Sequence, residues 1–163
     1  MLGKKKDIAL SKKKDTSLSK KGETGLTNVN YQRDRLYKKG INLMADEKLE
    51  EAVRNFEMIL RADPNDVEAM LKLGYSRFHL EDHSEAMRVY DKILDIDVTN
   101  PEAWNLKSLV NYEKKNYAKA LDCAEKAIDS DPTYGMAWYN KACYLSMLNQ
   151  VPDSLEALKR SIE

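Results

Sequence analysis

The chain of 163 residues has only two cysteines and two histidines, so it lacks most of the side chains that metal sites and nucleophilic enzymes need. Cys123 and Cys143 have neither the spacing of metal ligands nor that of a disulfide framework, and we interpret them as small apolar residues in a reducing compartment. His79 and His83 lack an obvious third ligand. Glycine-rich phosphate loops and nucleophile elbows are also missing from the sequence. We therefore expect a protein without catalytic activity, cofactor or bound metal.

Long apolar runs are missing as well. No segment is long enough for the apolar part of a signal peptide or for a membrane span, so we expect a cytoplasmic protein with no membrane partner. No segment shows the clean two-residue alternation of Val, Ile and Thr that is typical of a strand. These absences favour an all-α protein.

What the chain does contain is a repeat with a period of 34 residues. One set of small residues keeps this period without an insertion or a deletion: Ala52, Ala86, Ala120 and Ser154. A second set keeps the same period: Gly40, Gly74, Ser108 and Ala142. A long exact period is typical of a stacked array, in which each unit buries its apolar face against its neighbours.

Each unit contains two helical segments. In residues 67–100, apolar and small residues recur at spacings of three and four from Met70 to Phe78. A polar break at 80–83 follows, and a second helical period runs from Ala86 to Ile96. The spacing predicts two helices of about 13 residues joined by a short turn. The small residues of the period should let these two helices approach each other closely.

One further pattern lies in residues 101–134, where these residues follow in order: Trp104, Ser108, Tyr112, Tyr117, Ala120, Ala124, Ala127 and Pro132. This pattern closely resembles the tetratricopeptide repeat, a helix–turn–helix of 34 residues. The runs AWNLKS at 103–108 and AWYNKA at 137–142 are similar to an Ala-Trp-x-x-Lys-Gly variant often seen in archaeal members. The resemblance implies a superhelical α-solenoid over residues 31–163, with tandem repeats at 33–66, 67–100, 101–134 and 135–163.

Residues 1–30 differ in character from the rest of the chain. They hold eight lysines against three acidic residues, a charge of +5, which leaves −5 on residues 31–163. Three lysine-rich octads begin at Lys4, Lys12 and Lys20, and their apolar content is low. We expect a disordered tail. In one alternative function, this tail tethers the protein to nucleic acid or to an acidic surface; because no aromatic residue lies between the lysine clusters for base stacking, we do not expect nucleic acid as the partner.

The resemblance also implies where a ligand binds, because in this family the first helix of each repeat lines the concave face. The groove residues it implies are Tyr37, Ile41, Glu68, Leu71, Tyr75, Phe78, Asn105, Leu109, Tyr112, Met136, Tyr139 and Cys143. The inward positions carry acidic residues and no Lys or Arg, and their middle is aromatic and apolar. We expect a scaffold that binds a peptide or helix with an apolar core and basic flanks. In the alternative, some of these side chains, Phe78 in particular, pack between repeats.

Members of the family that clamp the acidic C-terminus of heat-shock chaperones use Lys, Asn and Arg side chains. The matching positions here are Tyr37, Ile41, Lys72, Glu102 and Leu106. Counted from one repeat later, they are Leu71, Tyr75, Leu106, Met136 and Asn140. Because neither set can neutralise a carboxylate tail, we do not expect a chaperone C-terminus as the partner.

The last helical segment carries Leu155, Leu158 and Ile162 at a helical spacing. In an array, the next repeat would cover part of this stripe. We therefore expect either that the natural chain continues or that this C-terminal edge mediates self-association, which leaves a self-assembly module as a further alternative.

Overall fold

The computed structural model describes residues 16–162, together with the side chains of residue 28 and residues 30–162. Within this range the chain forms eight α-helices and no strand, which confirms the predicted all-α fold. The helices are α1 (Thr16–Ala45), α2 (Leu49–Ala62), α3 (Val67–His79), α4 (His83–Ile96), α5 (Pro101–Glu113), α6 (Tyr117–Ser130), α7 (Gly135–Met147) and α8 (Val151–Arg160).

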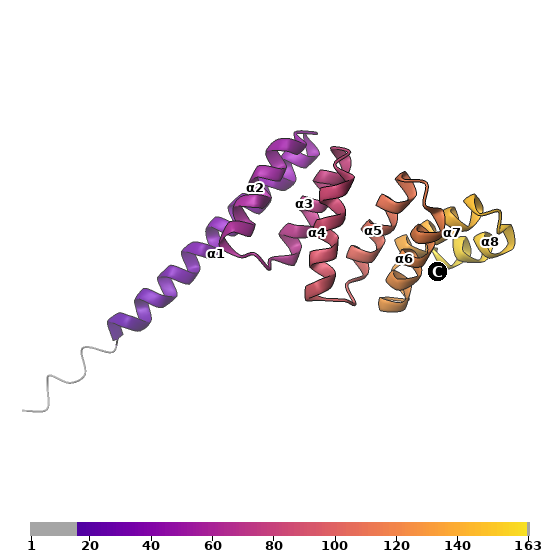
Figure 1. Cartoon of the computed structure of the whole chain (residues 1–163). Helices are drawn as coiled ribbons and strands as arrows, with labels where there is room; N and C mark the ends of the chain where they lie inside the picture. Colours follow the sequence, from indigo (N-terminus) through magenta and orange to yellow (C-terminus); the bar gives the residue numbers. More distant parts are fainter. Residues whose placement is uncertain (1–15, 163) are drawn as a thin grey trace, which may run out of the picture.

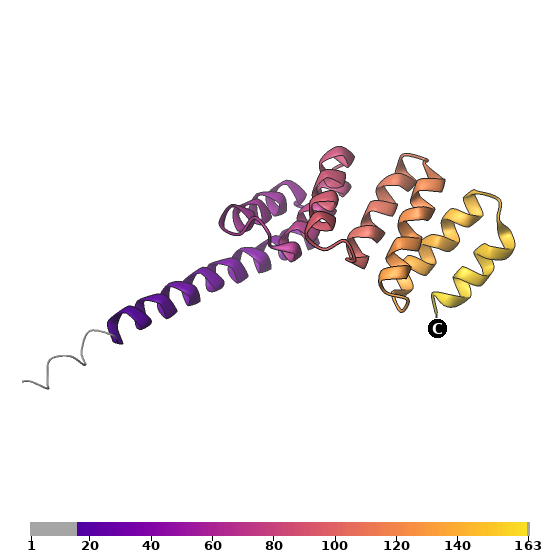
Figure 2. The same cartoon turned by 60° about the horizontal axis from the view of Figure 1, so that its bottom comes forward.

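The helices pair into hairpins that stack side by side along one direction, from α1 and α2 at one end to α7 and α8 at the other (Figures 1 and 2). Helix α1 is much longer than the others, and its first half projects beyond the array. It begins at Thr16, inside the segment expected to be a disordered tail. Residues 16–30 hold two lysines and two leucines beside two glycines and five serines or threonines, so helix propensity does not account for this extension. The lysine clusters at 4–6 and 12–14 lie outside the described residues.

The stack has two layers, and their contacts show which layer lies on the inside of the curve. Each of the second helices α2, α4 and α6 packs against its own partner and against the first helix of the next hairpin, and α8 packs against its partner α7. Helices α1, α3, α5 and α7 also contact one another in turn, whereas between residues 16 and 162 no two of α2, α4, α6 and α8 do so. In a curved double layer the helices of the inner layer approach most closely. Helices α1, α3, α5 and α7 therefore line the concave side.

The same turn closes every hairpin. One residue in each turn has a left-handed backbone, with φ of 60°, 61°, 59° and 59° at Glu47, Glu81, Lys115 and Asn149. The next residue then donates its N–H to a carbonyl five positions earlier, as from Asp82 to Arg77 at 3.0 Å. This is a Schellman motif, which satisfies the carbonyls at the end of the first helix. The turn thus recurs with the period of the sequence.

Within each hairpin, a small residue on the first helix faces the second helix. In the first two hairpins the small residues are Gly40 and Gly74, and they face the fully buried rings of Phe56 and Tyr90. A Cβ atom added to Gly74 would lie only 2.4 Å from Cε1 of Tyr90. The absence of a side chain at this position therefore lets a large aromatic ring fill the space between the two helices.

Candidate peptide-binding face

The predicted groove residues all lie on the inner helices, but they differ in exposure. Tyr75, Met136 and Tyr139 are exposed at 38%, 61% and 55%, and Glu68 is exposed as well. Six others are half-buried: Tyr37, Ile41, Phe78, Leu109, Tyr112 and Cys143. Leu71 and Asn105 are buried, at 7% and 1% exposure. The accessible apolar and aromatic part of the predicted set is therefore concentrated at Tyr75 and on α7.

Leu71 and Asn105 contribute to packing between repeats. Leu71 belongs to the main apolar core. The Asn105 side chain accepts a hydrogen bond of 2.8 Å from Nδ2 of Asn140, on the next inner helix. The sequence analysis predicted that Leu71 and Asn105 contact a ligand directly. This prediction does not fit their burial, because the neighbouring helix covers both side chains. Phe78 also packs against the core, and its ring stacks on that of His83 in the same repeat, with centroids 5.4 Å apart.

A hollow of about 630 Å³ opens beside the accessible Met136 and Tyr139. Its apolar wall comes from Leu109 on α5 and from Tyr134, Met136 and Tyr139 in and just before α7. Ile162 and Ser161, which follow α8, complete it. The sequence analysis did not assign Ser161 and Ile162 to the groove, because they follow a second helix, and only the packing of α8 against α7 brings them there.

The middle of the face is aromatic. The rings of Tyr75 and His79 lie 4.3 Å apart between centroids, and Tyr75 is the more accessible neighbour of the half-buried Phe78. The Tyr112 ring lies 5.4 Å from that of the buried Tyr144, so Tyr112 supports the packing of the third and fourth hairpins. Tyr75 is thus the aromatic side chain in this middle part that is best placed to meet a ligand.

Ion pairs between successive inner helices change the electrostatics that the sequence suggested. Arg33 donates hydrogen bonds to Asp66 and Glu68, with Nε 2.8 Å from the Asp66 carboxylate. Lys72 pairs with Glu102 at 3.6 Å. The pKa of Tyr37 is raised to about 12, mainly because the side chain is partly buried and secondly because it forms a hydrogen bond with Glu68. The acidic residues Glu68 and Glu102 are therefore each paired with a basic residue outside the predicted groove set.

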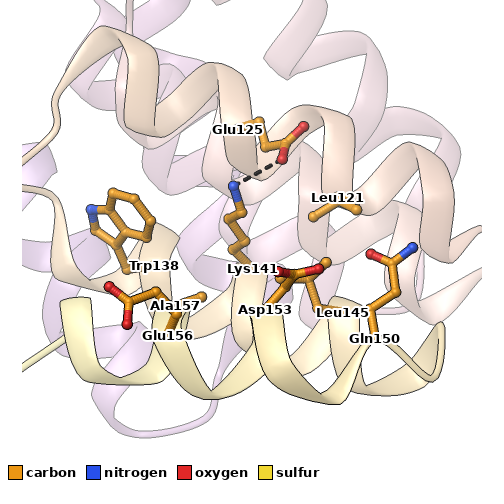
Figure 3. Close-up of a pocket in the computed structure, with 9 residues that line it drawn as sticks. All are labelled: Leu121, Glu125, Trp138, Lys141, Leu145, Gln150, Asp153, Glu156 and Ala157. Carbon is orange, nitrogen blue, oxygen red and sulfur yellow. Dashed lines mark ion pairs between the residues drawn. The ribbon is translucent and has the colours of Figure 1, made fainter.

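A smaller pocket of about 280 Å³ lies between α6, α7 and α8 (Figure 3). Trp138 and Lys141 line it, and Lys141 forms an ion pair of 2.9 Å with Glu125 across it. Within the described part of the chain, no group of three or more His, Cys, Asp or Glu residues is arranged to hold a metal ion. None of the helices there combines the length and the apolar character that crossing a membrane requires. The hollow on the inner side is the larger of the two.

Stacked helical hairpins with inner and outer layers define the class of α-solenoid proteins. Family models described as tetratricopeptide repeat match residues 43–110, 101–134 and 123–156. The chain belongs to the tetratricopeptide repeat family, as its sequence pattern suggested. None of the curated proteins matches the sequence.

Solved structures share the fold. A crystal structure of MamA is 25% identical, with a TM-score of 0.65, and the match covers 76% of this chain and 72% of that one. TTC0263, a thermophilic tetratricopeptide protein of Thermus thermophilus, is 18% identical with a TM-score of 0.72, covering 80% and 73%. The first such domain of Spaghetti (RPAP3), bound to the HSP90 peptide SRMEEVD, is 15% identical with a TM-score of 0.67, covering 73% and 94%. The last two likenesses concern the fold alone.

Proposed function

We propose that this protein is a non-catalytic interaction scaffold that binds a peptide or a helix along the concave face of α1, α3, α5 and α7. The observation that carries the proposal is the exposure of apolar and aromatic side chains on this face: Tyr75 on α3, and Met136 and Tyr139 on α7, which line a hollow of about 630 Å³. Tyrosine presents a flat apolar body with a polar tip, and it is enriched in protein interfaces. Extended concave surfaces of this kind are what repeat arrays use for binding.

The ligand we propose has an apolar core that enters the hollow at Met136 and Tyr139. Basic flanks contribute less than the sequence suggested, because Arg33 and Lys72 already pair with Glu68 and Glu102. We place the contact of a basic flank instead at Glu113 of α5, which is exposed and which the family resemblance places among the inward positions. Apolar burial should therefore dominate the affinity, so binding should depend only weakly on salt.

An acidic chaperone tail is not the ligand we propose. The Spaghetti (RPAP3) domain is bound to the HSP90 peptide SRMEEVD, which carries three acidic residues. At the positions that match the family clamp, this chain has Tyr37, Ile41 and Leu106, and its one lysine there, Lys72, pairs with Glu102. A carboxylate-rich peptide would lose its hydration here without gaining a free cation.

Selection of peptides from a random display library tests this function. Peptides rich in apolar and aromatic residues should be enriched by the wild type, and the Tyr75→Ala, Tyr139→Ala double variant should bind them at least about tenfold more weakly, since interface aromatics commonly carry about 2 kcal/mol. Tyr31→Ala is a matched control, because Tyr31 is 69% exposed on α1 and lies outside the predicted groove. Equal binding by the double variant would refute the concave face as the site, and enrichment of acidic peptides would refute the proposed ligand.

The tethering alternative makes the opposite prediction for salt. A tail that binds phosphates releases counterions, so its affinity should fall steeply as salt rises. Weak salt dependence together with loss of binding in the double variant supports the groove. Steep salt dependence with full binding by the double variant supports the tail.

A further inference from the structure

Helix α1 presents a basic strip on the side that faces away from the array. Its exposed residues between 31 and 45 recur at spacings of three and four, which places them on one face of the helix. Within residues 16–162, α1 contacts α2 and α3 and no other helix, so this face is uncovered (Figures 1 and 2). Asp34, the one exposed acid between residues 31 and 45, lies at the margin of the face and pairs with Arg33. We call five side chains of this face the α1 strip: Gln32, Arg35, Lys38, Lys39 and Asn42.

The cations of the α1 strip have no acidic partner. Among the described side chains, no ion pair joins Arg35, Lys38 or Lys39 to an acid. The outer helices differ, because charges of both signs lie on them and pair within the helix, as Lys126 does with Asp122 at 2.7 Å. The α1 strip is thus a surface of one sign whose charges the fold itself leaves unused.

The boundary between the basic and the acidic part of the chain falls at the end of α1. Residues 1–45 hold 12 lysines and arginines against four acidic residues, a charge of +8, and residues 46–163 carry −8. The segment that precedes the α1 strip in the sequence is itself basic, so it cannot neutralise the strip. A basic region of this kind attracts a polyanion.

The α1 strip is not built to pack against another hairpin. At the position of Arg35, the later first helices have a fully buried alanine: Ala69, Ala103 and Ala137. At the position of Asn42, they have a buried residue as well: Ser76, Val110 and Tyr144. A further hairpin stacked on α1 would bury an arginine without a partner, which is costly. The occupant of this face therefore has to be polar and negatively charged.

Double-stranded DNA fits the α1 strip better than an acidic protein or an anionic membrane. Among residues 31–45, no exposed side chain is aliphatic and larger than alanine, so the face lacks both the apolar centre of a protein interface and the side chains that insert into a bilayer. Exposed ion pairs with scattered carboxylates contribute little. DNA instead offers a dense row of phosphates, and each contact releases condensed counterions. Arg, Lys, Asn and Gln are side chains that bind DNA phosphates.

A single helical face also favours DNA over other nucleic acids. The major groove of DNA admits an α-helix, whereas that of double-stranded RNA is too narrow for side chains to read. Single strands are held by stacking of bases on aromatic side chains. The sequence analysis did not expect nucleic acid because such aromatic residues are missing between the lysine clusters. That reason does not apply to a duplex, whose bases remain stacked on one another.

We propose that the α1 strip binds double-stranded DNA through its phosphates, without preference for a base sequence. Such binding has a dissociation constant of roughly 1–100 µM near physiological salt. The α1 strip shares no residue with the predicted groove, so the inference does not depend on the proposed groove ligand. It adds that a peptide bound on the concave face is held close to DNA.

Fluorescence anisotropy of a short labelled DNA duplex of mixed sequence, titrated with the full chain at several salt concentrations, tests the site. The triple variant Arg35→Gln, Lys38→Gln, Lys39→Gln should bind at least about tenfold more weakly at low salt, because three phosphate contacts are lost. The slope of log affinity against log salt should become shallower by about one for each lost contact.

A matched control removes the same charge elsewhere. The triple variant Arg54→Gln, Lys114→Gln, Lys119→Gln replaces one exposed arginine and two exposed lysines outside α1, and it should bind DNA nearly as well as the wild type. Circular dichroism checks that each variant is folded. The groove double variant Tyr75→Ala, Tyr139→Ala should also bind DNA normally, so failures of the two proposals can be told apart.

Competition separates the classes of partner. Unlabelled duplex DNA should displace the probe, whereas polyglutamate, vesicles that contain phosphatidylserine, single-stranded DNA and double-stranded RNA should compete more weakly. Equal or stronger competition by any of these four would overturn DNA as the partner. A wild type that does not bind the duplex, full binding by the α1 strip variant, or equal losses in the strip variant and its control would overturn the α1 strip as the site.

Discussion

Replacement of Gly74 by alanine should destabilise the protein, although alanine is the better helix former. The new Cβ would lie 2.4 Å from Cε1 and 3.0 Å from Cδ1 of the Tyr90 ring, far inside a normal contact. The ring is fully buried and has no room to retreat. Overpacking of this kind costs about 1–3 kcal/mol, and at such a short distance we take the upper value. The gain in helix propensity offsets about 1 kcal/mol, which leaves a net loss of about 2 kcal/mol.

The sign of this effect should reverse when the ring is removed. Tyr90→Ala alone leaves a cavity and should cost about 3–5 kcal/mol. In that background the added methyl group of Gly74→Ala meets no ring, so the helix propensity remains and the substitution should stabilise by about 1 kcal/mol. Ala142→Gly is a matched control at the same position of the fourth hairpin. It should cost about 1 kcal/mol, because alanine already fits there.

Guanidinium chloride unfolding, followed by circular dichroism, gives the free energy of unfolding of all these variants. In thermal melts the single variant should unfold roughly 4–8 °C below the wild type for a chain of this size. A Gly74→Ala variant that is as stable as the wild type would refute the argument that this ring excludes a side chain. The same conclusion would follow if the effect had the same sign in both backgrounds.

Two further predictions concern the ends of helices. Arg33→Ala should destabilise by about 1 kcal/mol at neutral pH, because the partly buried pair with Asp66 ties α1 to the start of α3. Arg33 also donates a hydrogen bond to Glu68, which holds the pKa of Glu68 below its ordinary value, so the part of the stabilisation that comes from Glu68 is present above about pH 4.3 and is lost as the pH falls further. Chemical unfolding from neutral to acid pH should show the two proteins converging, and a constant difference would contradict the assignment. Glu81→Gly should stabilise the protein by about 1 kcal/mol, because Glu81 has a left-handed backbone with a φ of 61°, which glycine adopts without strain. Glu51→Gly in α2 should instead destabilise it by about 1 kcal/mol, because glycine is a poor helix former. Thermal melts measure both effects, and equal signs for the two variants would argue against the left-handed turn.

Much of the fold could be predicted from the sequence, because its determinants are local. The period of 34 residues repeats the helix-forming faces, the polar break and the small residues such as Gly40 and Gly74 within one short stretch. A hairpin of this length buries its apolar face against itself and its immediate neighbours, so short-range patterns are sufficient to define it. The early start of α1 was not expected, because residues 16–30 have a low apolar content and hold glycine, serine and threonine, which are poor helix formers.

The accessible part of the candidate site depended on tertiary structure. Tyr37, Leu71, Asn105 and Tyr139 occupy the same position of the four repeats, yet they are half-buried, buried, buried and exposed. From the sequence period alone, all four would be expected to face the ligand. Their burial differs because it depends on which helix packs next to each, as Asn140 does beside Asn105.

The sequence by itself therefore determined the class of fold, the register of the hairpins and the inner positions that the family pattern implies. Only the tertiary structure decided which of these positions are exposed and which acids pair with basic residues. The pairs Arg33 with Glu68 and Lys72 with Glu102 join residues about one repeat apart, and no local pattern encodes them. The physical reason is that exposure and electrostatic pairing are properties of the space between helices, and stacking creates that space.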